Sequence, residues 1–552
     1  MKKNFFIILF TTLCCLSFAI IDSNEYLDIN LKDKNGTFGF GSYHRDNYFF
    51  MFGGVDTNGY AEFETKTHLN IDSPELFGFL FAGDIYLGLT KDREIGGEFE
   101  KFGGLTMYYG EAYLGYENKF TSIRVGFQSL NSSDAIYNHL LVDDYSGPIF
   151  AMRFNQFMSR FFDMEIVYSF IRPHSTDWTT NFTQERIQTG QFGKSLFYKK
   201  FNFRPLPWIR IGLGDSVYFL GNNFNIYYMN PLGIYFMTLA QDKFWERKYG
   251  TEDAVDASSL KIDLDFNIGF NGWRFYGEML IDDSDGFFVT FKPSIFPNRL
   301  AFVLGGELRG ELITRYIRLP KAADFFVTNL YINAEYGVAS KYCYTRDDNN
   351  NYEYVRQEYR TKYSASNPMT KSEINYIQRR GNFLGFMYGN NADCFDLAIG
   401  WRNDLKQTQN YVVGYQNDRY FESQTQKKEI NRLFKIQFHY RHYRLGDERN
   451  VVCPFYSNEH YFFDVDKDLD TDGDGITDND TSNRRTEFLR IVEEQGDIFD
   501  INIYSDLFRV TRFTMGMETK FNFIWQTYHP LTIAQRTDFT FKWEIAFVAS
   551  WH

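Results

Sequence analysis

Apolar and polar residues alternate with a period of two along most of this 552-residue chain, most clearly in its last segment, 538–552. Successive side chains of a strand point to opposite faces, so this pattern predicts a strand with one apolar and one mixed face. A run of about ten such residues with aromatics at both ends is typical of a tilted strand that crosses a bilayer. A soluble two-sheet protein also uses alternating strands, but it rarely carries so many large aromatics on a terminal one. The apolar face consists of Phe539, Phe541, Trp543, Ile545, Phe547, Ala549 and Trp551.

The same alternation recurs along the chain and predicts a series of strands. Asn35 with Gly36, and later Asn271 with Gly272, supply the positive-φ positions of tight hairpin turns. Short turns that alternate with longer connections are typical of an up-and-down meander. The predicted strands cover 27–32, a strand from 38, 61–71, 77–89, 107–116, 123–129, 162–170, 208–213, 260–270, 273–281, 287–291, 300–312, 325–336, 395–401, 433–440, 498–504 and 513–523.

These strands predict one closed barrel and no separate soluble domain. After the first twenty residues, no run of 18 or more apolar residues offers a membrane-spanning helix. A sheet exposed to lipid must close, because its edges find no hydrogen-bond partners in hydrocarbon. Residues 20–552 therefore predict an all-β fold, a closed antiparallel up-and-down transmembrane β-barrel of about 16–18 strands. The last strand is expected to pair with the strand near Leu27 or Phe38.

Longer polar connections near 172–194, 341–380, 402–430 and 442–495 are expected on the outer side of the membrane, where such barrels carry their long loops. Two segments interrupt the strand pattern. Residues 135–144 and 237–249 have a helical pattern, and we expect them to be plugs in the lumen or helices in loops.

Composition supports a barrel and argues against one class of partner. Aromatic residues make up 19% of the chain although the mean hydropathy is −0.40, a combination that suits aromatic girdles around a polar interior. The net charge of −13 argues against nucleic acid, since phosphate binding needs clustered Lys and Arg. It is compatible with a protein that meets cations or neutral sugars.

Residues 1–19 have the features of a secretory signal peptide, with Lys2 and Lys3, an apolar core over 5–18, and Ser17 and Ala19 at the cleavage site. Export of a β-barrel predicts the outer membrane of a Gram-negative-type cell, with outer-membrane lipid as a partner. A terminal aromatic strand also resembles the signal read by the barrel-insertion machinery, here displaced by one residue because His552 follows the last aromatic.

Three cysteines remain after the signal peptide, namely Cys343, Cys394 and Cys453. An odd number permits at most one disulfide. Cys343 and Cys453 lie in loop-like regions and are candidates to pair. No CxxC motif indicates a zinc or redox site.

The acidic segment 464–481 (DVDKDLDTDGDGITDNDT) has the spacing of a calcium loop. Alternate carboxylates converge on one hard cation, and Gly475 at position six permits the sharp turn. The spacing resembles the thrombospondin type-3 repeat more than an EF-hand, because position twelve is Thr481. The predicted ligands of a structural Ca²⁺ ion are Asp468, Asp470, Asp472, Asp474, Asp478 and Asp480.

A solvated acidic loop is the alternative interpretation of this segment. However, so many adjacent carboxylates repel one another unless a cation lies between them. We expect the ion to rigidify an exposed loop, with an affinity on the order of 0.1–1 mM. Asp464 and Asp466 extend the set toward a second ion.

The sequence predicts no enzyme. Ser216 in the Gly-Asp-Ser motif of 212–223 resembles a serine-esterase nucleophile, but it lies in a strand and no Asp-x-x-His pair supplies a base. The nine histidines form no HExxH motif. Charged residues that alternate with apolar ones are instead expected to form ion pairs on the inner wall, or a charged constriction that selects solutes. They are Arg210, Asp215, Arg274, Glu278, Glu307, Arg309 and Glu311.

The segment 203–235 resembles the Wzi-like capsule-assembly proteins of outer membranes. The similarity rests on Arg204 with Pro205, an Arg-containing apolar strand over 208–213, the Gly-Asp-Ser-Val and Gly-Asn-Asn elements, and Asn230 with Pro231 and Leu232. The resemblance implies an occluded outer-membrane barrel of about eighteen strands that binds surface polysaccharide on its outer side.

Three functions follow as hypotheses. The first is a Wzi-like barrel that binds or organises surface polysaccharide through exposed aromatic, acidic and amide side chains. The second is a porin-like channel that passes small solutes through a polar lumen. The third is a surface adhesin with a calcium-stabilised loop, whose cell binding a chelator abolishes.

Overall fold

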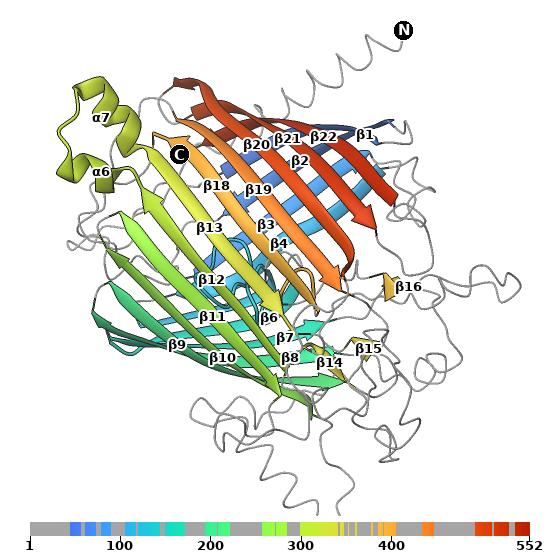
Figure 1. Ribbon diagram of the computed structural model, residues 1–552. Coiled ribbons are helices and arrows are strands. Elements are labelled where there is room, and N and C mark those ends of the chain that lie inside the picture. The colour runs from blue at the N-terminus through green and yellow to red at the C-terminus, as the bar shows by residue number, and fades with distance from the viewer. Residues whose placement is uncertain are drawn as a thin grey trace, which may run out of the picture.

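One sheet of 18 strands closes into a barrel in the computed structural model of this chain (Figure 1). The number of strands agrees with the prediction of about 16–18. The structure describes residues 45–56, 61–72, 79–89, 105–117, 120–143, 149–159, 161–171, 194–206, 208–220, 257–270, 272–283, 299–340, 343–346, 351–352, 359–360, 377–378, 385–389, 391–403, 433–446, 492–510, 513–528 and 536–551.

Each barrel strand pairs antiparallel with the next barrel strand in the chain, as an up-and-down meander requires. The first nine strands are β1 (Arg45–Asp56), β2 (Ala61–Asp72), β3 (Phe79–Leu89), β4 (Leu105–Glu117), β5 (Thr121–Gln128), β6 (Ile149–Phe157), β7 (Phe162–Ile171), β8 (Lys194–Leu206) and β9 (Ile209–Leu220).

The second nine strands continue the same order. They are β10 (Ala257–Phe270), β11 (Trp273–Asp283), β12 (Arg299–Arg309), β13 (Leu330–Ala339), β18 (Ala392–Arg402), β19 (Phe434–Gly446), β20 (Val492–Val510), β21 (Phe513–Tyr528) and β22 (Arg536–Trp551). Two small hairpins lie in the connection between β13 and β18. They are β14 (Thr345–Arg346) with β15 (Asn351–Tyr352), and β16 (Tyr359–Arg360) with β17 (Ile377–Gln378).

The last strand closes the ring by pairing with the first. β22 pairs with β1 over its length, from Trp551 opposite Arg45 to Thr540 opposite Asp56. The predicted closing role of 538–552 is confirmed. Its partner is β1, described from Arg45 onward, and Leu27 and Phe38, near which the partner was expected, lie outside the described residues.

Connections of different length leave the two ends of the barrel. At one end, which we call the turn end, strands join through 73–78, 118–120, 158–161, 207–208, 271–272, 310–329, 403–433 and 511–512. At the other, the loop end, they join through 57–60, 90–104, 129–148, 172–193, 221–256, 284–298, 340–391, 447–491 and 529–535. The expected placement of 402–430 on the same side as the other long connections is wrong, because β18 and β19 are joined at the turn end. In outer-membrane barrels short turns face the periplasm and long loops face outward. Gly272, with φ +87°, makes the predicted tight turn between β10 and β11.

Two short helices, α6 (Glu311–Tyr316) and α7 (Lys321–Thr328), stand in the β12–β13 connection at the turn end. The predicted strands 300–312 and 325–336 are therefore wrong at 311–312 and 325–328, which are helical. Pro320 directly before α7 fixes a φ suited to starting a helix. Among the described residues, no helix is long and apolar enough to cross a membrane.

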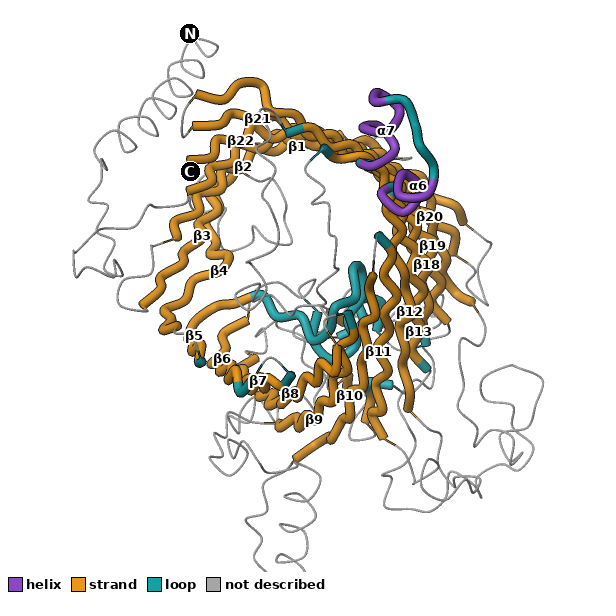
Figure 2. Tube along the Cα trace, turned by 90° about the vertical axis from the view of Figure 1, so that its left-hand side faces the viewer, coloured by secondary structure: helices purple, strands orange, loops and turns teal. Residues whose placement is uncertain are grey.

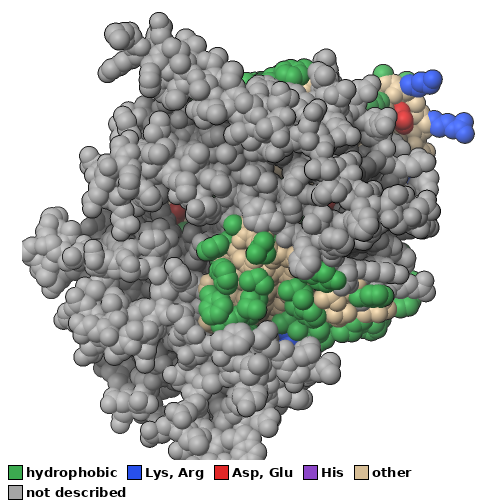
Figure 3. Space-filling model, turned by 180° about the vertical axis from the view of Figure 1, so that it is seen from behind, with side chains coloured by type: hydrophobic (Ala, Val, Ile, Leu, Met, Phe, Trp, Pro, Cys, Tyr) green, Lys and Arg blue, Asp and Glu red, His purple; other side chains and the backbone are tan. Residues whose placement is uncertain are grey.

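The outward-facing side of the strands is apolar. Along β12, Phe302, Leu304 and Leu308 are exposed, whereas Ala301 and Val303, at the alternate positions, are buried. The same exposure recurs at Ile211 and Leu213 on β9, and Figure 3 shows hydrophobic side chains gathered on the described outer surface. Because a closed barrel with an apolar exterior and unequal ends is the architecture that spans an outer membrane, the chain is an outer-membrane β-barrel protein.

Candidate functional site

A segment of the β5–β6 connection lies inside the ring of strands, and we call its residues 129–143 the plug (Figure 2). Of the two alternatives for 135–144, a plug in the lumen or a helix in a loop, the first holds for 135–143. The predicted helix is wrong, because these residues form bends without regular secondary structure. The reason is that their backbone N–H groups donate to side chains of the barrel wall instead of to carbonyls of their own segment. Residue 144 and the other predicted plug, 237–249, lie outside the described residues.

Polar groups of the plug close it into a compact loop. The N–H of Ser132 donates to the carbonyl of Val142 at 3.0 Å, and the N–H of Val142 donates to Ser132 Oγ at 3.1 Å. The N–H of His139 donates to Asp143 Oδ2 at 2.9 Å. Ser133 Oγ lies 2.9 Å from His139 Nδ1. The plug therefore has a defined shape of its own.

Glu278, on the lumen face of β11, is the first of two carboxylates that hold the plug. It accepts hydrogen bonds from Ser132 Oγ at 2.9 Å and Ser133 Oγ at 2.7 Å. It also accepts the backbone N–H groups of Leu140 at 3.0 Å and Leu141 at 3.3 Å. One buried carboxylate thus binds both the first half of the plug, at 132–133, and the second half, at 140–141.

Glu335 on β13 is the second carboxylate. It accepts the N–H groups of Ile136 at 2.9 Å and Tyr137 at 3.1 Å, and the amide of Asn138 at 2.8 Å. The hydroxyl of Tyr276 donates to it at 2.7 Å from β11.

A glycine on β12, the strand between β11 and β13, makes the hydrogen bond from Tyr276 to Glu335 possible. Gly305 of β12 lies opposite both Tyr276 and Glu335 in the register. A Cβ at this position would lie 2.4 Å from the Tyr276 ring. Gly305 therefore lets the phenol cross β12 to reach Glu335.

The tip of the plug reaches the turn end of the barrel. Asp134 accepts Arg210 Nε at 2.7 Å and Asn267 Nδ2 at 2.6 Å, while Arg274 donates to its carbonyl oxygen. Arg210 and Arg274 are each the second residue of a strand that starts at the turn end. Burial acts to raise the pKa of Asp134, but the adjacent Arg210 and Arg274 guanidinium groups hold it below its usual value. The plug thus extends from the loop end through most of the barrel.

Buried ion pairs line the wall beside the plug. Lys200 lies 2.7 Å from Asp263 and also contacts Asp265, which in turn pairs with Arg210. The side chains of Lys200 and Asp263 are fully buried. Lys200 also donates to the carbonyl of Ser132, so the ion-pair network and the plug share a member. Desolvated charges must be paired to be tolerated, and here each one is.

The predicted ladder of charges on the inner wall is confirmed in part. Arg210, Arg274 and Glu278 face the lumen and contact the plug, and Arg309 pairs with Glu307. The placement of two residues is wrong. Asp215 lies on the opposite face of β9, across from Lys199 on β8, because it is an odd number of residues from the lumen-facing Arg210. Glu311 lies in helix α6.

A third cluster ties the plug to β18 and β19. Asn138 Nδ2 donates to Asp396 at 3.1 Å, and Asp396 also accepts His439 Nε2 at 2.8 Å and Arg441 Nε at 2.5 Å. The Tyr137 ring stacks on the His439 ring at 4.7 Å. This cluster marks the boundary of the wall that the plug contacts.

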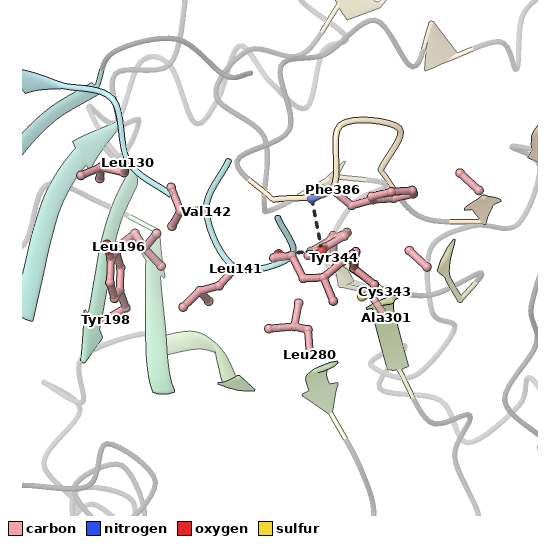
Figure 4. Packing of buried hydrophobic residues seen from close by; sticks show 14 of the residues in the cluster. Leu130, Leu141, Val142, Leu196, Tyr198, Leu280, Ala301, Cys343, Tyr344 and Phe386 are labelled. Carbon is pink, nitrogen blue, oxygen red and sulfur yellow. Dashed lines mark hydrogen bonds between the residues drawn. The ribbon is translucent and has the colours of Figure 1, made fainter. Parts of the chain in front are cut away.

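An apolar core forms where the plug meets two other loop-end segments (Figure 4). Leu140 and Leu141 pack with Tyr344, which follows β13, and with Phe386, which precedes β18. The Tyr344 hydroxyl donates to the carbonyl of Leu140 at 2.7 Å and accepts the N–H of Phe386 at 3.3 Å. Two connections from the loop end, β5–β6 and β13–β18, therefore share one core inside the barrel.

Cys343 and Cys394 are free thiols in this core. Cys343 therefore does not form the disulfide with Cys453 that the sequence left open. The region around Cys343 is folded into the core, and burial raises the pKa of its thiol well above the usual value. Cys453 lies outside the described residues.

The wall has two sectors that differ in their surroundings. The plugged sector, β8–β13, carries the buried network described above. The half-exposed sector, β20–β22, has lumen-facing polar residues that contact each other. Asn502 donates to Glu518 at 2.9 Å, Lys520 lies 3.6 Å from Glu518, and Asn522 donates to Asp500. Figure 2 places the described loops beside the plugged sector, across the ring from β21 and β22.

Several predicted site residues play no part in this arrangement. The six predicted calcium ligands, and the whole of 464–481, lie outside the described residues. Ser216 is buried in β9, opposite Lys261 and Tyr198, in the strand context that argued against a nucleophile. Among the described residues, no cluster of three or more His, Cys, Asp or Glu side chains is arranged to hold a metal ion.

Sequence reasoning missed the residues that matter most to the plug, including Asp134, Asn138 and Glu335. The only sequence signal for them was the break in alternation after β5. The partners lie 76 to 258 positions away along the chain, so no local pattern connects them.

No protein-family model matches the chain, and no curated protein matches it. Among solved structures, the chain is similar to Wzi, an outer-membrane carbohydrate-binding β-barrel involved in group 1 capsule assembly in Escherichia coli. The identity is 10% and the TM-score 0.44, over 91% of this chain and 84% of that one. It is also similar to OccD3 (OpdP) of Pseudomonas aeruginosa, with 10% identity and a TM-score of 0.41 over 93% and 92% of the two chains. For OccAB3 of Acinetobacter baumannii, the values are 7% and 0.40 over 92% and 99%.

Proposed function

We propose that this protein is an occluded outer-membrane barrel that binds or organises surface polysaccharide at its loop end. The observation that carries the proposal is the plug, whose backbone is held by Glu278 and Glu335 inside the barrel. A segment fixed to the wall by buried carboxylates along most of the barrel's height narrows the path that a solute would take. A binding protein gains from it, since the plug braces both ends of the long β13–β18 connection through Tyr344 and Phe386.

The resemblance of 203–235 to Wzi-like proteins supports the same class of ligand. Its Arg204 and Arg210 are both lumen-facing anchors, the first paired with Asp163 and the second with Asp134. These residues hold the barrel interior and do not face a ligand. We therefore expect polysaccharide to contact the long connections of the loop end, where aromatic, acidic and amide side chains are available.

Planar-bilayer conductance and a polysaccharide assay together test this proposal. The purified protein should show no stable pore of nanosiemens scale, and cells that lack it should lose surface-attached polysaccharide. A variant without residues 131–142 serves as the conductance control, because it removes most of the plug and should open a pore. Open pores in the intact protein, with polysaccharide retained by the deletion strain, would reject the proposal.

A porin-like channel is the second candidate, and the half-exposed sector favours it. Asp500, Glu518 and Lys520 face the lumen and are partly exposed, as polar residues lining a water-filled path are. In this case the intact protein conducts, and Lys520→Gln shifts the selectivity toward cations. The same conductance experiment therefore distinguishes the two candidates.

We also propose that 464–481 binds a structural Ca²⁺ ion outside the membrane. The support is its spacing of carboxylates and its place in the chain, since β19 and β20 are joined at the loop end. Calorimetry should show calcium binding that Asp472→Ala with Asp474→Ala abolishes. Asn479→Ala is the matched control, since it alters the same segment and leaves the predicted ligands in place. Unchanged heat in the double variant would refute the site.

Finally, we propose that β22 is read by the barrel-insertion machinery. Its register with both β1 and β21 makes it the strand that seals the barrel. Deletion of 547–552 should abolish membrane assembly, as judged by heat-modifiable migration in gels. A normal folded band after this deletion would count against the proposal.

A further inference from the structure

The β12–β13 connection, 310–329, carries helices α6 and α7 at the turn end, whereas 271–272 beside it and 207–208 further along are tight turns. On its other side β18 and β19 are joined by the longer connection 403–433, of which the structure describes only Asn403 and Leu433. Figure 1 shows the two helices projecting from the barrel beside the ends of β12 and β13. The proposed polysaccharide function does not involve them.

Helix α7 packs on the outer surface of the barrel through aromatic residues. The rings of Phe325 and Phe326 lie 5.8 and 6.1 Å from that of Trp401 on β18. Trp401 Nε1 donates to the carbonyl of Phe326 at 2.9 Å, and its ring lies 5.8 Å from that of Phe434 on β19. Trp401 is on the same face of β18 as Ile399, which is exposed on the apolar exterior. Helix α7 therefore adjoins the apolar outer face of the strands, which faces lipid.

The helix pair also exposes more apolar surface than a water-facing element ordinarily does. Its large exposed apolar residues come from both helices and from the residue after α6, and the most exposed of them, Tyr316, is 76% accessible. So many exposed large apolar side chains within residues 313–326 indicate a contact with a membrane or another protein. The residues are Ile313, Tyr316, Ile317, Phe325 and Phe326.

Basic side chains accompany this apolar surface. Arg315, Arg318 and Lys321 are exposed within seven positions of one another. Within the described part of the chain, none of them forms an ion pair. Figure 3 shows Lys and Arg side chains projecting at this corner of the molecule. Long basic side chains next to aromatic and aliphatic ones are typical of elements at a membrane interface, where the stem lies against apolar groups and the charge reaches headgroups.

We propose that α6 and α7 form an interfacial foot that binds the anionic phospholipid headgroups of the leaflet at the turn end. The apolar residues enter the boundary between headgroups and acyl chains, and Arg315, Arg318 and Lys321 contact lipid phosphates. Because α7 contacts Trp401 on the apolar outer face of β18, the foot lies at the turn end, where this apolar exterior ends. Its positive charge is complementary to an anionic surface, although the chain as a whole carries −13.

Site-specific fluorescence in lipid nanodiscs tests whether the foot contacts lipid. Tyr316→Cys, in a Cys453→Ser background, takes up a thiol-reactive fluorophore, since Cys343 and Cys394 are buried. Brominated phosphatidylglycerol should quench this label as strongly as one at Phe438→Cys, an exposed position on the outer face of β19. The matched negative control is Gln437→Cys, its neighbour on the lumen face, where Gln437 accepts a hydrogen bond from Tyr331. Quenching at 316 no greater than at 437 would overturn the proposal.

A charge-neutral variant tests the preference for anionic lipid. The triple variant Arg315→Gln, Arg318→Gln and Lys321→Gln should lower the ratio of retained phosphatidylglycerol to phosphatidylcholine about fivefold, measured by native mass spectrometry. Lys435→Gln, which removes a charge from the lumen face at the same end, should leave the ratio unchanged. An unchanged ratio in the triple variant would overturn the proposal. A dimer that Tyr316→Asp dissociates would also overturn it, because that result assigns the face to a second copy of the chain. Heat-modifiable migration confirms that each variant is folded.

Discussion

The two sectors of the lumen wall carry the same kinds of charged residue in different surroundings. In the plugged sector, Glu278 is 3% exposed and the side chain of Lys200 is fully buried. In the half-exposed sector, the side chains of Glu518 and Lys520 are 21% and 43% exposed, and that of Asp500 is 35% exposed. The difference arises from what lies against the wall, because the plug contacts one sector and ends at the boundary formed by Asp396.

This comparison indicates where the charged residues hold the structure together. A buried carboxylate must satisfy its hydrogen-bonding capacity within the protein, and Glu278 does so with four donors of the plug. A carboxylate with access to water is stabilised by solvent, so its ion pairs contribute little. Substitutions in the plugged sector should therefore affect the fold, and those in the half-exposed sector should affect only the local electrostatics.

The largest effect is expected from Glu278→Ala. The change leaves the N–H groups of Leu140 and Leu141 without their acceptor and removes a negative charge near Lys200. We expect a loss of about 3–5 kcal/mol in the free energy of unfolding, as for other broken buried charge contacts, and an increase in conductance. Glu518→Ala is the control in the other sector, with an expected loss of about 1 kcal/mol or less. Equal effects of the two substitutions would remove the distinction between the sectors.

The next effect is expected from Asp134, which holds the tip of the plug. Because its pKa is lowered in the folded protein, its ionised form stabilises the docked plug at neutral pH. That contribution should persist above the ordinary Asp value of 3.8 and disappear as the pH falls through the lower pKa of the folded state. Asp134→Ala should cost about 2–3 kcal/mol, since charge-assisted hydrogen bonds to Arg210 and Asn267 are lost.

Urea unfolding at a series of pH values measures this contribution. The wild-type protein should lose stability relative to Asp134→Asn only in the acid range, where the aspartate of the wild type becomes protonated. A difference between the two proteins that is constant from neutral to acid pH would contradict the assigned role of the charge.

The fold could be predicted from the sequence because period-two alternation is a local signal. Strands β10 and β11, with the turn at Gly272, were predicted nearly residue by residue, since Leu260 to Phe270 alternate without interruption. The predicted start of β13 is too early, because 325–328 contains two adjacent Phe residues, which are common in strands. These residues belong instead to helix α7, which follows Pro320. Closure was predicted, but its register was not, because it depends on pairing across the whole chain.

The lumen contacts could be predicted only in outline. A break in alternation indicated that residues around 135–144 leave the wall, and that was enough to propose a plug. It was not enough to give its conformation, because a helix and an irregular loop differ in where the N–H groups donate. Glu278 and Glu335 accept those groups from far along the chain. Such a contact follows from the barrel's register and leaves no trace in local sequence.

A smaller effect is expected from Gly305→Ala. The added Cβ would lie 2.4 Å from the Tyr276 ring, so the phenol has to leave Glu335. We expect a loss of about 1–3 kcal/mol, the usual cost of overpacking. The adjacent Gly306→Ala is the matched control. Its Cβ would meet the carbonyl of Arg274 at 3.3 Å and the Phe275 ring only at 4.0 Å. If both variants unfold at the same urea concentration, the crossing of Tyr276 over β12 is unimportant.

The smallest effect on stability, and the most informative about function, is expected from Lys520→Gln. Lys520 lies 3.6 Å from Glu518 and is 43% exposed, so its loss should change the free energy of unfolding by at most about 1 kcal/mol. If the barrel is occluded, this substitution has no effect on conductance, because no ions pass the half-exposed sector. Combined with Glu278→Ala, however, it should shift the ion selectivity toward cations, because releasing the plug lets ions reach Glu518 and Asp500 without the neighbouring positive charge. Selectivity measured from reversal potentials in both backgrounds checks this result. A shift in the single variant would mean that the half-exposed sector already conducts, and it would favour the channel over the polysaccharide-binding barrel.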